Sequence, residues 1–489
     1  MPIHRHHSLA ILFTLLLNLT IQSVAQAEAD RVSYMLNEPV FHGQSYIVEA
    51  GRQNKQVIVL VHGLGDLASD TWNGIIPELA KQFHVVSFDL PGFGRSSKAN
   101  LLYSPDSYAA FIDFVVSRFT QEKIMLVGHS LGGNLALRYA TLYPQKVKRL
   151  MLVDAAGVLH RISYSKFLVH FGIKLLPQFY AQQSDDVQSF TNMIIGQIAA
   201  QSDLVDAGEK MLLNDPSLRQ TLLGGEPQAI AAYAMIMTDY TGLLPKLQVP
   251  TLILWGKQDI VIPLRNGKVM ATNLPNAGLV VFDQTGHSPA HERPQRFLSW
   301  IQRFTAGTDA EFNQLLETTR YAIDRNIQNH SERIVHCQNQ NNQLYVGDYK
   351  LMIIDNCQNV EVDSARIQSL SIKHSQVTMS NCLVSSAGKA IYLEDSSLQM
   401  NGCKVSGSPA LAFNRARIDI AGSELISSSG AAIQNLATES GPATTLSLPD
   451  PVASIAAHDT ILFSITHLKS KYLDKDMHGP VNIKPRQAW

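Results

Sequence analysis

Short apolar runs alternate with amphipathic stretches between about residues 57 and 300. Six runs are rich in β-branched and aliphatic residues and are flanked by Gly or Pro, which is typical of buried strands. They cover residues 56–61, 84–88, 123–127, 149–153, 251–255 and 278–282. Helical periodicity marks segments between them, including residues 71–82 and 131–142. This alternation predicts an α/β fold, a parallel sheet covered by helices, over residues 28–306.

The alternation stops between Asp154 and Pro245, where the chain becomes helix-prone. Apolar side chains such as Phe171, Leu175 and Phe179 recur there. We interpret residues 157–245 as a helical cap inserted into the α/β domain. An apolar cap favours acyl or alkyl groups over sugars, because an apolar pocket leaves hydroxyls unpaired. The alternative is that these side chains only fill the cap's own core.

The composition changes after residue 306. Residues 309–329 have a helical period and predict a connecting helix within a linker over 307–335. Beyond it, Ile354, Met379, Met400 and Ile420 stand three residues before Cys357, Cys382, Cys403 and Ser423, at intervals of about 20 to 25 residues. Stacked coils bury a face that one coil cannot bury alone. Residues 336–435 therefore resemble a right-handed parallel β-helix, with an irregular β-sandwich as the alternative and a tail over 436–489.

Four cysteines, Cys337, Cys357, Cys382 and Cys403, occupy the same position of this repeat. Stacked strands lie about 4.8 Å apart, within the Cα separation that a disulfide tolerates. We therefore expect a cysteine ladder, with Cys337 bonded to Cys357 and Cys382 to Cys403 as the simplest pairing. The alternative is that the thiols are small buried hydrophobes whose Cβ vectors are too nearly parallel for bonding.

The N-terminus has the pattern of a secretory signal. A basic start is followed by an apolar run over residues 9–21 and by Ala25-Gln26-Ala27, a small-x-small cleavage pattern. We predict a signal peptide over residues 1–27 and an exported protein, periplasmic or secreted. With 40 basic and 41 acidic residues the net charge is -1, so no global field favours nucleic acid.

Gly128-His129-Ser130-Leu131-Gly132 matches G-x-S-x-G and lies between a predicted strand and a predicted helix. This context makes Ser130 a candidate nucleophile, exposed on a sharp strand-to-helix turn. The loop His62-Gly63-Leu64-Gly65 follows another strand. The backbone N–H groups of Leu64 and Leu131 are the expected oxyanion donors, and a simple tight turn is the alternative reading of that loop.

Two further loops follow predicted strands and supply an acid and a base. They are Gly256-Lys257-Gln258-Asp259 and Thr285-Gly286-His287-Ser288. A serine hydroxyl attacks only when a base takes its proton, so we assign His287 as base and Asp259 as the acid that holds the imidazole. Asp154 also ends a strand and is the weaker candidate acid. His129, His291 and His84 have a structural interpretation, in packing or at a strand start.

By these residues the chain resembles the α/β-hydrolase superfamily, specifically its capped lipase and esterase branch, over about residues 46–304. The segment from Asp89 to Ser96 belongs to this resemblance as a turn without a catalytic part. A serine at position 130, where dehalogenases and epoxide hydrolases carry aspartate, argues against those chemistries.

The resemblance implies a serine hydrolase that cleaves a small-molecule ester or lipid through an acyl-enzyme. A serine-dependent carbon–carbon hydrolase or a cofactor-free haloperoxidase shares the triad and stays open. So does an envelope-binding or adhesion protein that acts through its β-helix, with possible polysaccharide contact. No Cys-x-x-Cys, His-Glu-x-x-His or phosphate-binding glycine loop occurs, and we expect no cofactor or metal.

Overall fold

The computed structural model describes residues 31–159, 214–236, 238, 240, 242–324, 327–427 and 432–436, and five short strands between residues 454 and 482. The expected signal peptide and residues 160–213 of the expected cap lie outside the described residues. Within the described part, no helix is long and apolar enough to cross a membrane.

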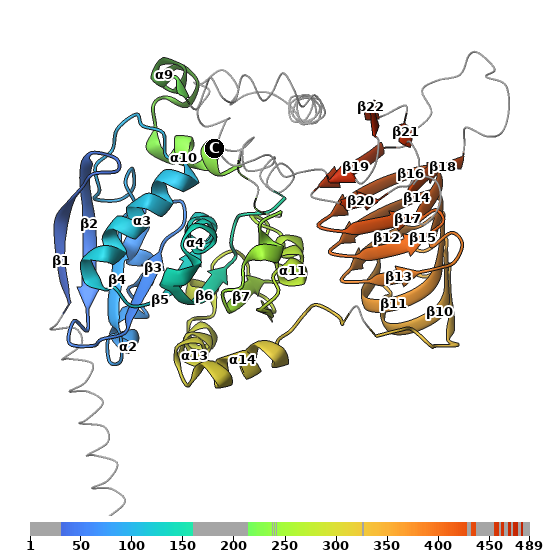
Figure 1. Ribbon diagram of the computed structural model, residues 1–489, viewed down its shortest axis with the longest axis horizontal. Coiled ribbons are helices and arrows are strands. Elements are labelled where there is room, and N and C mark those ends of the chain that lie inside the picture. Colours follow the sequence, from blue (N-terminus) through green and yellow to red (C-terminus); the bar gives the residue numbers. More distant parts are fainter. Residues whose placement is uncertain are drawn as a thin grey trace, which may run out of the picture.

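An eight-stranded sheet organises the N-terminal unit, in the order β1-β2-β4-β3-β5-β6-β7-β8 (Figure 1). Strands β3 to β8 run parallel, and β1 and β2 form an antiparallel hairpin at one edge. All six predicted runs are strands, so the predicted α/β fold is confirmed here. The bounds are β1 Val32–Glu38, β2 Gly43–Ala50, β3 Val57–Val61, β4 His84–Phe88, β5 Ile124–His129, β6 Val147–Val153, β7 Thr251–Gly256 and β8 Ala277–Phe282.

Helices cover both faces of this sheet because successive strand residues point to opposite faces. Val57, Val59 and Val61 of β3 pack with α3, α4 and α11, whereas Ile58 and Leu60 pack with α2, α13 and α14. The larger helices are α3 Pro105–Phe119, α4 Leu131–Leu142, α9 Pro216–Leu223, α10 Pro227–Ile236, α11 Leu264–Asn273, α13 Pro294–Thr305 and α14 Asp309–Thr318. Shorter turns are η1 Ala68–Trp72, α2 Ile76–Leu79, η2 Pro144–Lys146, η3 Leu244–Lys246 and α12 Pro289–Glu292.

Two predicted helices differ from the structure. Residues 71–82 form not one helix but η1 and α2, separated at Gly74 and restarted with Pro77 in the first turn of α2. The predicted helix over residues 309–329 ends at Thr318. Its start is fixed by a capping box between Thr308 and Glu311, and its end by sheet contact, because the carbonyl of Thr319 accepts the N–H of Leu279 in β8.

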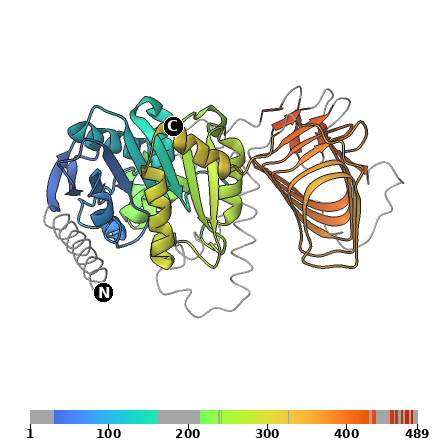
Figure 2. The same cartoon turned by 90° about the horizontal axis from the view of Figure 1, so that it is seen from below.

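The C-terminal unit is a sheet that winds into stacked turns, and its strands run parallel except for β23, which pairs antiparallel with β20 (Figure 2). In the row that contains Met379, Met400 and Ile420, the fourth member is Val362. Ile354 lies instead in a row with Ile372, so its predicted repeat position was wrong. The strands are β9 Ile334–Gln338, β10 Leu344–Asp355, β11 Val360–Lys373, β12 Gln376–Ser380, β13 Leu383–Ser385, β14 Ile391–Asn401, β15 Lys404–Gly407, β16 Leu411–Ala421, β17 Glu424–Ser427, β18 Ile433–Asn435, β19 Ser454–His458, β20 Ile461–Phe463 and β23 Val481–Asn482. A separate hairpin pairs β21 Leu468–Ser470 with β22 Leu473–Met477.

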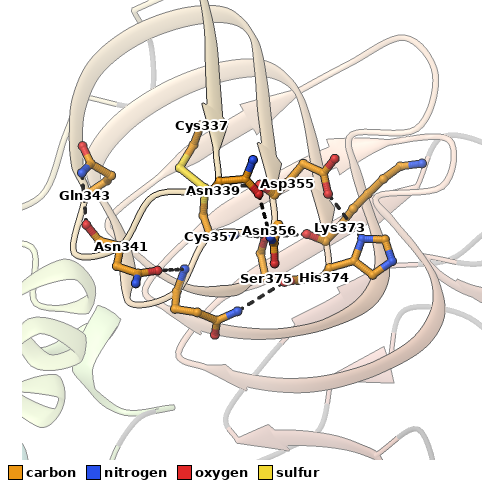
Figure 3. The surroundings of a disulfide bond; sticks show 11 residues. Cys337, Asn339, Asn341, Gln343, Asp355, Asn356, Cys357, Lys373, His374 and Ser375 are labelled. Carbon is orange, nitrogen blue, oxygen red and sulfur yellow. Dashed lines mark hydrogen bonds and ion pairs between the residues drawn. A yellow bond between two sulfur atoms is a disulfide. The ribbon is translucent and has the colours of Figure 1, made fainter.

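The cysteines form two pairs at different corners of these turns. Cys337 and Cys357 are joined by a disulfide with Cα atoms 6.6 Å apart (Figure 3). Cys382 and Cys403 are buried and form no disulfide, and the N–H of Cys382 donates to Sγ of Cys403. The N–H of Cys357 donates instead to Ser375 in the next turn. The prediction of a single cysteine ladder is therefore wrong. The long strand β11 contributes to two rows of stacked residues, one through Ile372 and one through Val362. Cys357 follows the first row and Cys382 follows the second, so the two cysteine pairs lie at different corners.

Helix α11 of the N-terminal unit contacts the C-terminal unit directly. Arg265 donates to both carboxylate oxygens of Asp419, at 2.7 and 2.8 Å, and Lys268 pairs with Asp363 at 2.5 Å. The amide of Asn273 donates to the carbonyl of Gly422 at 3.3 Å. These contacts fix the C-terminal turns against the helix that follows the loop of Asp259.

Candidate active site

Ser130 lies on a strained turn between β5 and α4. Its φ of 54° and ψ of -117° are rare for a residue with a side chain, and such strain concentrates at functional sites. The N–H of Ser130 donates to the carbonyl of Val153 in β6 at 3.0 Å, which holds the turn against the sheet. A Cβ atom at Gly128 would lie 2.2 Å from the carbonyl oxygen of Gly132, so the turn requires glycine there.

The structure brings Ser130, His287 and Asp259 together from three separate loops. Nε2 of His287 lies 2.9 Å from Oγ of Ser130, and Nδ1 lies 2.7 Å from Oδ2 of Asp259. The other carboxylate oxygen of Asp259 accepts the N–H groups of Val261 and Ile262 at 2.8 and 2.9 Å. The side chain of Asp259 is fully buried and that of His287 is 20% exposed. The imidazole therefore connects a buried acid to a hydroxyl.

Two neighbours orient His287. Glu292 accepts the N–H groups of Gly286 and Ser288, at 2.7 and 3.0 Å, and so fixes the loop on both sides of the histidine. His129 packs its ring 5.1 Å from that of His287, and its Nε2 lies 2.8 Å from the His287 carbonyl. Burial, with the nearby charge of His287, lowers the pKa of His129 to about 3, so the ring is neutral and donates to this carbonyl. The sequence did not reveal this role for His129.

The loop after β3 is held by His62, a second residue whose role the sequence did not reveal. Its Nε2 accepts the N–H of Leu90 at 2.9 Å, which places the ring proton on Nδ1, 2.7 Å from the carbonyl of Gly63. Burial lowers the pKa of His62 to about 4 and keeps it neutral. In a trans peptide the N–H points opposite to the carbonyl, so the Leu64 N–H points away from His62.

The expected oxyanion donors lie beside Ser130. A Cβ atom on Gly63 would be 2.9 Å from Cβ of Ser130, so the loop of Leu64 passes directly against the serine. Leu131 is the first residue of α4, where backbone N–H groups have no partner within the helix. The N–H of Leu131 therefore has no partner within α4 and directly follows Ser130 in the chain. The N–H of Leu64 follows Gly63, which lies against Ser130 in space.

Asp89 has the structural part that the resemblance implied. Its carboxylate accepts from the backbone and side chain of Ser69 and from the backbone and side chain of Arg95. Burial acts to raise the pKa of Asp89, but these hydrogen bonds outweigh it and the pKa is lowered. The charge of Asp89 therefore stabilises the turn after β4.

The other two histidines that the sequence singled out, His84 and His291, differ in their surroundings. His84 opens β4 and lies 2.7 Å from Glu49 in a buried pair, in agreement with its structural interpretation. His291 in α12 is exposed, so its predicted packing part is wrong.

His129, Asp154 and His287 place possible metal-ligand atoms within 4.8 Å of one another. Since both ring nitrogens of His287 already have partners, we assign no metal to this group.

Comparison with known proteins places this geometry in a family. Residues 56–294 match the family described as alpha/beta hydrolase fold. A protein of Mycobacterium tuberculosis is 32% identical over 279 residues, which cover 53% of this chain and 77% of the relative. The 2-hydroxymuconate semialdehyde hydrolase of Pseudomonas sp. (strain CF600) is 30% identical over 262 residues, which cover 52% of this chain and 88% of the relative. The solved esterase from Exiguobacterium antarcticum has a TM-score of 0.43 at 21% identity, covering 55% of this chain and 98% of that chain. The chain therefore belongs to the α/β-hydrolase fold family.

Proposed function

We propose that this hydrolase cleaves carboxylic esters through an acyl-enzyme on Ser130. The observation that carries the proposal is the continuous connection from Oγ of Ser130 through His287 to the buried carboxylate of Asp259. A hydroxyl bonded to a neutral imidazole can lose its proton as it attacks, and the acid stabilises the imidazolium that forms.

The reaction uses each of these groups in turn. His287 takes the Oγ proton while Ser130 attacks the ester carbonyl, and the N–H groups of Leu64 and Leu131 stabilise the oxyanion. The tetrahedral intermediate then breaks its bond to the alkoxide, which takes the proton from His287 and leaves as the alcohol, and the acyl group stays on Ser130. A water molecule, deprotonated by His287, attacks the acyl group. The acid product leaves when the serine regains its proton.

A carbon–carbon bond hydrolase is the second candidate. It is favoured by the relative that is named a 2-hydroxymuconate semialdehyde hydrolase. Both reactions use a serine and a histidine, so the triad geometry does not separate them, and a cofactor-free haloperoxidase is a further alternative with the same triad. We place ester cleavage first because Ser130, His287 and the oxyanion N–H groups suffice for every step of it, whereas carbon–carbon cleavage also needs a proton delivered to the carbon that leaves.

The experiment has two parts. A fluorophosphonate probe should label wild-type protein at Ser130 and leave Ser130→Ala unlabelled, which tests the activated serine alone. Turnover of p-nitrophenyl esters of increasing chain length is then compared with turnover of a 2-hydroxy-6-oxo-dienoate. Labelling together with faster dienoate turnover would replace the ester proposal with the second candidate, and absence of labelling would refute both.

The other parts of the chain support further proposals. We propose that the stacked parallel turns of residues 334–427 are a right-handed parallel β-helix, on the basis of their parallel register. We propose that α9 and α10 belong to a cap, that residues 1–27 direct export, and that the C-terminal unit contacts envelope polymers. Protein N-terminal sequencing after expression tests export, and retention on purified cell-wall polysaccharide tests the last proposal.

A further inference from the structure

A second carboxyl group lies beside the acid of the triad. Asp154 directly follows β6 and Asp259 follows β7, and these strands are parallel neighbours with Val153 paired to Leu254. The carboxyl ends of both strands therefore meet at the same edge of the sheet. Asp154 is completely buried, with 0% of its surface exposed. Its φ of 42° lies in the left-handed region that Asp and Asn tolerate better than most residues.

The two oxygens of Asp154 have different surroundings. Oδ1 accepts the N–H of Gly256 at 2.8 Å, whereas Oδ2 is buried without a hydrogen-bond partner among the described residues. One oxygen of Asp154 lies within 4.8 Å of a ring nitrogen of His287. Buried oxygens without partners are rare and call for a physical reason. The carboxyl group of Asp154 therefore lies close to the ring of His287, whose Nδ1 proton Asp259 already accepts.

Asp154 differs from Asp259 in charge. Burial raises the pKa of Asp154 well above its usual value, the charge of Asp259 raises it further, and the Gly256 hydrogen bond only partly opposes this. Two neighbouring buried carboxyl groups cannot both ionise cheaply, so Asp154 is the neutral member of the pair. Asp259 is favoured because two N–H groups already solvate its carboxylate.

We propose that Asp154 is a reserve acid of the triad, a positioning residue whose Oδ2 accepts the Nδ1 proton of His287 when Asp259 is absent. This inference rests on the proposed function of His287 as base. Removal of Asp259 takes away a repelling charge and leaves the Nδ1 proton without an acceptor, and both changes favour the ionised form of Asp154. The remaining charged or titratable groups that face it are His287, His129 from β5 and Glu292 from α12.

Three variants test the proposal, namely Asp259→Ala, Asp154→Asn and the double variant, assayed with p-nitrophenyl butyrate. Asp154→Asn should change kcat less than about threefold, because an amide keeps the acceptor for Gly256 and resembles a neutral acid. We expect Asp259→Ala to lower kcat about 10- to 100-fold and the double variant to lower it about 10⁴-fold. Equal kcat values for Asp259→Ala and the double variant would overturn the proposal.

The pH profile separates a reserve acid from a packing residue. Activity of Asp259→Ala should rise with pH through a step that wild type lacks, because Asp154 must lose its proton there and its burial is unchanged. The double variant should lack this step. If Asp259→Ala is too unstable, Asp259→Ser gives the same comparison, since its short hydroxyl can accept an N–H group of Val261 or Ile262, whereas the NH2 group of an asparagine would donate to Nδ1 of His287 and force the wrong tautomer.

A spectroscopic readout is independent of ester turnover. In protein labelled with ¹⁵N-histidine, the carboxylate-bonded Nδ1 proton of His287 gives a far-downfield signal. The signal should persist in Asp259→Ala and vanish in the double variant. Loss in both variants would refute the reserve acid. A wild-type protein that shows the signal but hydrolyses no ester would refute the proposed function while leaving this test intact.

Discussion

Replacement of Arg265 by Met should uncouple the two structural units. Its guanidinium in α11 donates to both oxygens of Asp419 in β16 and also bonds the side chain of Asn401 in β14. The Arg265 side chain is 11% exposed and that of Asp419 is 30% exposed. Met fills most of the same volume but removes every donor, so the variant isolates the polar contact.

The expected cost follows from this partial burial. Loss of one member of a fully buried pair costs about 3–5 kcal/mol, whereas exposed pairs contribute about 0–1 kcal/mol. The intermediate exposure of Arg265 and Asp419 gives about 2 kcal/mol. At roughly 2–4 °C per kcal/mol for a unit of this size, the lower-melting calorimetric transition should fall by about 4–8 °C.

The chain offers a matched control. Arg415 forms an equally bidentate pair with Asp395, at 2.6 Å for both contacts, within the C-terminal unit. Those side chains are 56% and 30% exposed, so Arg415→Met should cost less than about 1 kcal/mol. A double-mutant cycle with Asp419→Asn should give a coupling energy of about 1–2 kcal/mol. A transition shifted no further by Arg265→Met than by Arg415→Met would refute the reasoning.

Three other predictions concern catalysis, boundaries and acid stability. Ser130→Ala and His287→Ala should each lower kcat about 10⁴- to 10⁶-fold with unchanged melting temperature, as measured with p-nitrophenyl esters, and a large fall in melting temperature would instead indicate a structural role. A chain that ends at Asp324 should be soluble and active, whereas one that ends near Thr308 should aggregate, because it loses the buried Phe312 and Leu316 of α14; size-exclusion chromatography separates these outcomes. The pKa of His62 in the fold is about 4, below the ordinary 6.5, so the unfolded chain binds more protons between these values. The free energy of unfolding is therefore not reduced by His62 above about pH 6.5. As the pH falls from 6.5 towards 4, it decreases by about 3 kcal/mol, because the unfolded chain takes up a proton that the buried ring does not. Urea denaturation of wild type and His62→Gln at pH 7.5 and 5.0 measures it, because His129, whose pKa is also lowered, contributes in both proteins; a loss of stability no smaller in the variant would contradict the burial argument.

Several features could be predicted from the sequence because they depend on local pattern. The six parallel strands carry continuous apolar runs, and α4 starts directly after the Gly-flanked Ser130. The edge strands β1 and β2 could not be predicted in this way, since the face of β1 is mostly exposed and its apolar signal is weak. Local pattern also placed Ser130, Asp259 and His287 in loops after strands, and the order of those loops indicated the family.

Only the tertiary structure decided how distant groups act on the site. His62 and Asp154 owe their charge states to complete burial, and the partly buried His129 owes its charge state to packing beside His287; both depend on segments far away in the sequence. The same holds for the cysteines, whose spacing suggested one ladder although strand register put them at two corners. Sequence spacing fixes which side chains repeat along the chain. The path of the backbone through space decides which of them meet, and the removal of water there decides which carry a charge.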